Sequence, residues 1–195
     1  MKIDRRVLSF IGCVALLVFT VECSEAEAPE GEPISFSAPP AAATGGLAFT
    51  TPDGWVEETP SSGMRRLQYR LPATAGDAEV AVFADIGGTP EQNISRWISQ
   101  FTTEDGGSVA DEAKVTQEEI GGFNVTILDV EGTYSGAMSA PMAGQGGGAS
   151  PGYRMLAAVI ETGGNPWFVK LTGPQGSVAE WEDSFHEFVK SAKPE

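Results

Sequence analysis

The chain has 195 residues, a formal net charge of −15 and a single histidine, and a length of this order favours one folded domain. The surplus of carboxylates would be repelled by phosphate backbones and anionic lipid headgroups, which argues against nucleic-acid binding and electrostatic docking to membranes. Hydrophobic residues make up 41% of the chain, which is enough for one core, so the acidity is not that of a disordered polypeptide.

The first 23 residues have the features of an export signal. Lys2, Arg5 and Arg6 form a positive start, and a mostly apolar run over residues 7–21 follows. This run is shorter than the about 20 residues of a membrane-spanning helix and suits the core of a signal peptide. We therefore predict export to the periplasm or to the outer face of a membrane.

Cys23 directly follows the apolar run, in a position that resembles the acylated cysteine of bacterial lipoproteins. That pattern has a small residue before the cysteine, whereas this sequence has Glu22. Cleavage after Ala26 would instead release a soluble protein. Lipid anchoring at Cys23, soluble secretion and an uncleaved anchor all stay open, and we expect membrane association only through such an N-terminal anchor.

A linker and one domain are expected after the signal. Residues 24–46 are rich in Glu, Pro, Ala and Ser, which predicts a disordered linker. Both cysteines precede it, so the domain expected over 47–195 has no disulfide, thiolate ligand or cysteine nucleophile. Within the domain, residues 135–152 are a Gly/Ala/Ser-rich stretch that predicts a flexible loop between strands.

The first half of the domain is predicted to contain three strands and a helix. The strands are expected over 47–50, 64–71 and 79–85 from their apolar alternation and turn signals. Thr89, Pro90 and Gln92 form a capping box that starts the helix, which we expect to end near Asp105. The apolar face of this helix consists of Ile94, Trp97, Ile98 and Phe101.

The second half is predicted to contain four strands and a second helix. The strands are expected over 113–120, 123–134, 153–161 and 167–172, and Gly121-Gly122 forms a hairpin turn between the first two. Ser177, with Glu180 three residues later, predicts the start of the last helix. Because most strands are linked by hairpins, the expected fold class is α+β, an antiparallel sheet of about six to seven strands covered by helices.

Four short motifs carry a resemblance to a known group of proteins. They are Thr51-Pro52-x-x-Trp55, Asn93-Ile94-x-Arg96-Trp97-x-x-Gln100-Phe101, Gly132-Thr133-Tyr134 and Lys170-Leu171-Thr172-Gly173-Pro174. With them, the chain resembles the PsbP/Mog1-like α/β/α sandwiches, and more closely a family of uncharacterised bacterial exported proteins. The resemblance implies a binding or assembly role rather than catalysis, and it transfers no ligand.

Patterns typical of catalysis or cofactor binding are missing from the sequence. His186 is the only histidine available to a Ser-His-Asp triad, and we interpret it as a residue at the border of a helix's apolar face. The glycine-rich run over 144–149 does not lead into a helix, as a dinucleotide site requires. We therefore predict no catalytic residue, no cofactor and no metal site.

One polar group of residues is a candidate binding surface. Asn93, Arg96 and Gln100 lie at helical spacing beside the apolar stripe, and Lys170 belongs to a shared motif. One interpretation is a surface that grips an anionic or amide group. The other, which we favour from sequence, is that Arg96 pairs with sheet carboxylates or caps nearby backbone carbonyls, that Lys170 pairs with a carboxylate, and that the two amides tie the helix to a loop.

The sequence thus predicts an exported cell-envelope protein that acts as a non-catalytic binding or assembly module. Its partner would be a protein or a small molecule, and not nucleic acid. Two alternatives stay open: a small hydrolase that uses paired carboxylates, and a surface protein that associates with copies of itself.

Overall fold

The computed structural model describes residues 46–136 and 149–195. The predicted signal peptide with Cys23, the linker up to residue 45 and residues 137–148 lie outside the described residues. The glycine-rich run over 144–149 falls almost wholly within that second gap.

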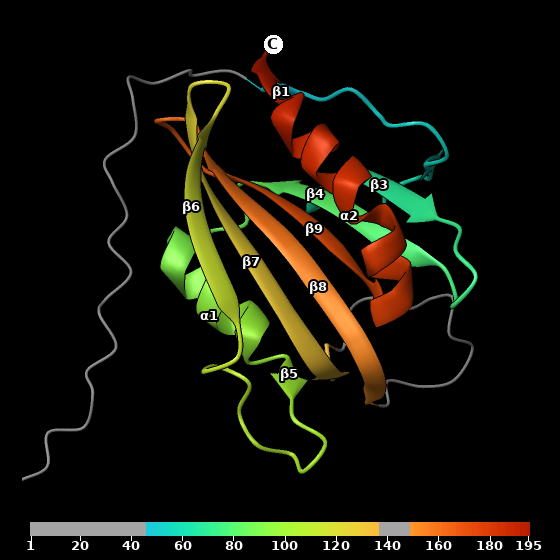
Figure 1. Cartoon of the computed structure of the whole chain (residues 1–195). Coiled ribbons are helices and arrows are strands. Elements are labelled where there is room, and N and C mark those ends of the chain that lie inside the picture. Colours follow the sequence, from blue (N-terminus) through green and yellow to red (C-terminus); the bar gives the residue numbers. More distant parts are fainter. Residues whose placement is uncertain (1–45, 137–148) are drawn as a thin grey trace, which may run out of the picture. The chain divides into compact units, whose positions relative to one another are not determined.

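The described domain is built on one eight-stranded sheet in which every pairing is antiparallel (Figure 1). The strand order is β2-β3-β4-β9-β8-β7-β5, and β6 also pairs with β7. The strands are β2 (Val56–Glu57), β3 (Arg65–Leu71), β4 (Ala78–Ala84), β5 (Phe101–Thr102), β6 (Lys114–Ile120), β7 (Phe123–Tyr134), β8 (Ser150–Glu161) and β9 (Trp167–Pro174). The predicted α+β class is confirmed, with eight strands in the sheet rather than six or seven.

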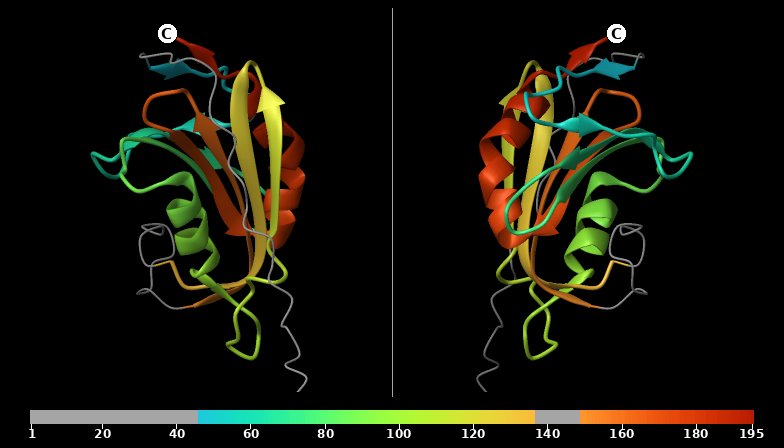
Figure 2. Two further views of the ribbon diagram at one scale, coloured as in Figure 1. Left: turned by 90° about the vertical axis from the view of Figure 1, so that its left-hand side faces the viewer. Right: turned by 90° about the vertical axis from the view of Figure 1, so that its right-hand side faces the viewer.

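Two helices, α1 (Pro90–Ile98) and α2 (Gln175–Lys190), lie on opposite faces of this sheet (Figure 2). Side chains alternate between the faces, so on β9 Val169 joins the core under α2 and Phe168 joins the core under α1. Strands covered on both faces become apolar throughout, as the buried residues Met155–Ile160 of β8 show. No helix within the described ranges is long and apolar enough to span a bilayer.

Helix α1 begins as the sequence predicts and ends earlier. The Thr89 hydroxyl accepts from the Gln92 N–H, and the Gln92 side chain accepts from the Thr89 N–H, so the capping box is confirmed. The helix stops at Ile98, and the expectation that it continues to Asp105 is wrong. Phe101 instead lies in β5, opposite Tyr134 of β7, because pairing with that distant strand replaces further helical turns.

Helix α2 does not begin at a serine cap. It starts at Gln175, directly after Pro174, and no side chain caps it. Ser177 is fully buried inside the first turn, and its hydroxyl donates to the Gly76 carbonyl at 2.6 Å. The predicted capping box at Ser177 is therefore wrong, because β9 runs straight into the helix and its serine is used to hold a neighbouring turn.

A small separate sheet joins the two ends of the described domain. It consists of β1 (Leu47–Ala48) and β10 (Lys193–Pro194), which pair antiparallel. The Glu195 N–H also donates to the Gly46 carbonyl at 3.0 Å. β10, β2 and β5 were not predicted, because a two-residue strand has no periodicity for sequence reasoning to detect.

Candidate functional site

Asn93 holds the start of α1 and orients Arg96. Its side chain is buried, at 2% exposed, and its amide donates to the carbonyls of Gly87 and Thr89, each at 3.0 Å. The amide oxygen accepts a hydrogen bond from Nη2 of Arg96, one turn along the helix. Asn93 therefore ties the helix to the preceding loop, as one of the sequence interpretations states, and it also fixes one edge of an exposed guanidinium.

Lys170 lies on β9, near the middle of the sheet, and its side chain reaches α1. Its Nζ sits over the indole ring of Trp97, 5.4 Å from the ring centroid. Among the described residues it makes no ion pair and no hydrogen bond, so the expectation that it pairs with a carboxylate is wrong. The Lys170 side chain is half-buried.

The surroundings of Lys170 disfavour its charged form. Burial contributes most to lowering the pKa, and the positive charges of Arg65 and Arg96 lower it further. The carboxylate of Glu79 acts in the opposite direction, and the resulting pKa of Lys170 is about 8. The Lys170 ammonium has no paired carboxylate among the described residues. A bound anion would provide that negative charge.

Glu79 leaves Lys170 unpaired because it is already bound to Arg65. Its Oε1 lies 2.9 Å from Nη1 of Arg65, which also donates to Oε1 of Gln68 at 2.9 Å. Gln68 in turn accepts from the Ser61 N–H at 2.8 Å and donates to Glu58. A polar network around β3 and β4 thus binds Nη1 of Arg65, and Lys170 makes no hydrogen bond or ion pair with it.

Gln100 does not belong to this group. It follows the end of α1, where its carbonyl accepts from the N–H and the hydroxyl of Ser135. Its side-chain Oε1 is buried without a hydrogen-bond partner. Of the four residues singled out from sequence, the structure thus connects Asn93, Arg96 and Lys170, and it places Gln100 in a contact between β5 and the end of β7.

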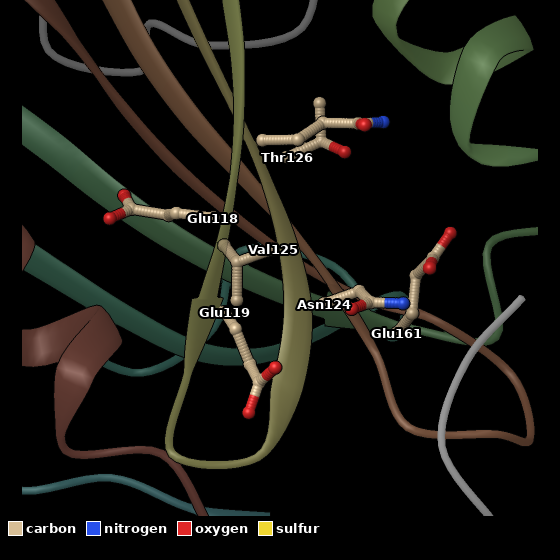
Figure 3. A pocket seen from close by; sticks show the side chains of 7 residues that line it. Glu118, Glu119, Asn124, Val125, Thr126 and Glu161 are labelled. Atoms are coloured by element: carbon tan, nitrogen blue, oxygen red, sulfur yellow. The ribbon is translucent and has the colours of Figure 1, made fainter. Parts of the chain in front are cut away.

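A second polar location is a pocket of about 200 Å³ at the hairpin of β6 and β7. It is lined by Gln117, Glu118, Glu119, Asn124, Val125, Thr126 and Glu161. Burial raises the pKa of Glu161, a hydrogen bond from Asn124 partly opposes this, and the nearby charge of Glu91 adds to the rise. In Figure 3 the carboxyl groups of Glu118, Glu119 and Glu161 point in different directions, and not toward one another as an acid–base pair requires.

An ion-pair network around Arg154 lies on the α2 face of the sheet, opposite Lys170, and was not predicted from the sequence. Nε and Nη2 of Arg154 bind both oxygens of Asp129, at 2.8 and 3.0 Å, and Nη1 binds Glu182 of α2 at 2.7 Å. Glu131, opposite Arg154 in the strand register, lies 3.4 Å away. The sequence signal that could have predicted this network is the alternate spacing of Asp129 and Glu131 on β7, together with Arg154 on the strand that follows. The network joins α2 to the sheet.

The remaining candidate for acid–base chemistry is His186 of α2. It is half-buried and packs edge-on against Phe185, with ring centroids 5.7 Å apart. Within the described residues, no group of three or more His, Cys, Asp or Glu side chains is placed to hold a metal ion.

Comparison with known proteins yields likenesses of fold only. No protein-family model and no curated protein sequence matches the chain. PsbP of the cyanobacterium Synechocystis shares 14% identity at a TM-score of 0.46, covering 86% of this chain and 100% of that one.

Two further solved structures are similar at the same level. LpqN, involved in cell envelope biogenesis of Mycobacterium tuberculosis, shares 12% identity at a TM-score of 0.47, covering 77% of this chain and 84% of its own. A Pseudomonas aeruginosa protein of unknown function shares 13% identity at 0.45, covering 77% and 99%. These likenesses say nothing about ligand or partner.

Proposed function

We propose that this chain is an exported protein of the bacterial cell envelope whose domain is a non-catalytic binding module. The binding surface of this proposal is the α1 face around Lys170 and Arg96. The observation that carries it is that Lys170, a half-buried cation, has no ion pair with a described carboxylate, in a chain whose net charge is −15. Carboxylates outnumber cations in the chain, so an uncompensated, half-buried ammonium favours an external anion as its partner.

The export part of the proposal rests on the N-terminal sequence. A positive start, an apolar run of signal-peptide length and a cysteine directly after it together favour translocation. Lipid anchoring through Cys23 remains one form of this proposal, and release after Ala26 is the other.

The non-catalytic part is supported by how the candidate catalytic groups are arranged. The pocket beside Glu161 holds carboxylates that diverge in Figure 3, and His186 packs against an aromatic ring. A carboxylate-dependent hydrolase would need two such groups facing each other across the substrate. Turnover of an ester, glycoside or phosphate substrate that is lost in Glu161→Gln or His186→Ala would overturn this part.

Intact-mass measurement and detergent partitioning after expression in a bacterial host test the export part. A mature protein that begins at Cys23, carries acyl chains and enters the detergent phase, while Cys23→Ser does neither, supports the tethered form. A soluble protein that begins near Glu27 in both variants supports the secreted form. Unprocessed protein that stays in the cytoplasm would overturn export.

A further inference from the structure

The ammonium of Lys170 is an exception among the inward-facing cations of the described domain. Arg154 is bound by carboxylates on both sides, and Arg65 is bound by Glu79 and Gln68. Lys170 has three N–H donors, and its ammonium lies over an indole ring without a hydrogen bond or an ion pair to any described residue. Holding a partly desolvated cation without an acceptor disfavours the folded state, because its lost hydration is not replaced. An arrangement with that penalty is expected where a ligand completes it.

Arg96 provides a second donor group whose orientation is set. Its Nη2 is bound to Asn93, whose own amide is held by two backbone carbonyls. The rest of the planar guanidinium has no carboxylate partner among the described side chains. Arg96 directly precedes Trp97, over whose ring the Lys170 ammonium lies, so both cations belong to the α1 face of the sheet. Carboxylate and phosphate groups accept hydrogen bonds from a guanidinium and from an ammonium, so this pair suits an oxyanion.

The other residues around Lys170 and the charge of the whole chain restrict the class of ligand. The ammonium lies over the ring of Trp97, and Arg65 adds positive charge while its Nη1 is bound by Glu79 and Gln68. The rest of the chain is strongly acidic and would repel a polyanion or an acidic protein surface. The geometry therefore fits a small molecule with one anionic group.

We propose, on the basis of the proposed function, that the α1 face binds the carboxylate or phosphate group of a small molecule between Lys170 Nζ and the Arg96 guanidinium. Trp97 holds the Lys170 ammonium through a cation–π contact, and Asn93 acts as a positioning residue through Arg96.

This site couples binding to protonation. The groups that face Lys170 are Arg65 from β3, Glu79 from β4 and Arg96 from α1. A bound anion favours the ammonium and raises the pKa of Lys170 above its free value of about 8. Binding above that pH therefore takes up a proton, and affinity falls about tenfold per pH unit until the pKa of the bound state is reached.

The experiment is a pH titration of the full-length protein, labelled with 13C at lysine Cε and held in mild detergent. The chain has five lysines, Lys2, Lys114, Lys170, Lys190 and Lys193, so the resonances are few, and Lys170→Met identifies the one of interest. The probes are acetate and inorganic phosphate, each compared with sodium chloride at equal ionic strength. We expect the midpoint of Lys170 alone to rise with at least one probe, and the two probes distinguish a carboxylate from a phosphate ligand.

Two arginine variants separate a site from general charge effects. Arg96→Gln should abolish most of the anion-induced rise in the Lys170 midpoint. Arg66→Gln, which removes an exposed arginine paired with Asp85, should leave it unchanged. An unmoved midpoint with both probes, or equal losses in both variants, would overturn the anion site. Such a failure leaves export and the absence of turnover standing, because those are tested by mass, partitioning and activity.

Discussion

Arg154 and Lys170 are cations on neighbouring strands of one sheet, and they face opposite sides of it. Arg154 lies under α2, where Asp129 binds it through two hydrogen bonds and Glu182 through a third, and these contacts raise its pKa. Lys170 lies under α1 without a carboxylate partner, and its pKa is lowered. Burial disfavours the charge in both cases, and only Arg154 is compensated.

From this difference we propose separate roles for the two faces. The network around Arg154 joins β7, β8 and α2, so it serves the packing of the long helix against the sheet. Each of the three guanidinium nitrogens of Arg154 already donates to a carboxylate. The α1 face combines an uncompensated ammonium with an oriented guanidinium, which favours binding over stability. The two cations should therefore respond in opposite ways to replacement by a neutral side chain.

Replacing Arg154 by Met should have the largest effect on stability. The change leaves Asp129 and Glu182 as partly buried carboxylates without counter-charge, and we expect a loss of about 2–3 kcal/mol in the free energy of unfolding. Urea denaturation measures it. Arg66→Met, which breaks the exposed pair with Asp85, is the matched control and should change stability by less than about 0.5 kcal/mol. Equal effects in both variants would contradict the structural role of Arg154.

Replacing Lys170 by Met should stabilise the ligand-free protein by about 1 kcal/mol at neutral pH. Methionine keeps an unbranched stem against Trp97 and removes the uncompensated ammonium. Lys114→Met removes an exposed lysine of β6 and should be nearly neutral. A destabilised Lys170→Met protein would show that the ammonium contributes favourably, contrary to the comparison with Arg154.

Stability should also depend on pH through Lys170. Its pKa is about 8 in the folded protein, against an ordinary value of 10.5. Between these values the unfolded chain holds a proton that the folded chain has released, so the free energy of unfolding rises with pH. Below pH 8 both states hold the proton and the penalty is fully present. Urea denaturation across this range should show the rise in the wild type, and the same curve should be flatter in Lys170→Met.

The smallest expected effect is at Glu161, near the other end of α1. Burial and the charge of Glu91 raise its pKa, so its ionised form disfavours folding at neutral pH. Glu161→Gln should add about 0.5 kcal/mol at pH 7, because the amide oxygen still accepts from Asn124. The gain should vanish as the pH falls and Glu161 itself becomes protonated. Glu180→Gln, an exposed change on α2, is expected to show no such pH dependence.

Local signals in the sequence were sufficient for the start of α1 and for the long strands. The capping box spans four residues, Thr89 to Gln92, and depends on nothing outside them. The end of α1 was mispredicted because Phe101 pairs with Tyr134, a residue far along the chain. Ser177 was mispredicted for the same reason, since its hydroxyl is bound by the distant Gly76 carbonyl.

The candidate site follows the same rule. Helical spacing placed Asn93 and Arg96 within one turn, and the structure joins them. The acidic composition suggested that Lys170 finds a carboxylate, but Glu79, whose charge acts on Lys170, is paired with Arg65 of the adjacent strand β3. Composition gives the average chance of an ion pair, whereas the strand order decides which acids are already bound.

The pairing of β1 with β10 has a consequence for how the chain can be rearranged. Gly46 and Glu195 are joined by a backbone hydrogen bond, so the ends of the described domain lie side by side. A short peptide linking them would close the domain into a ring, and new ends opened at the exposed Gly121-Gly122 turn would give a circular permutant with the same contacts. In such a permutant the linear order of the elements changes while Lys170 and Arg96 keep their neighbours.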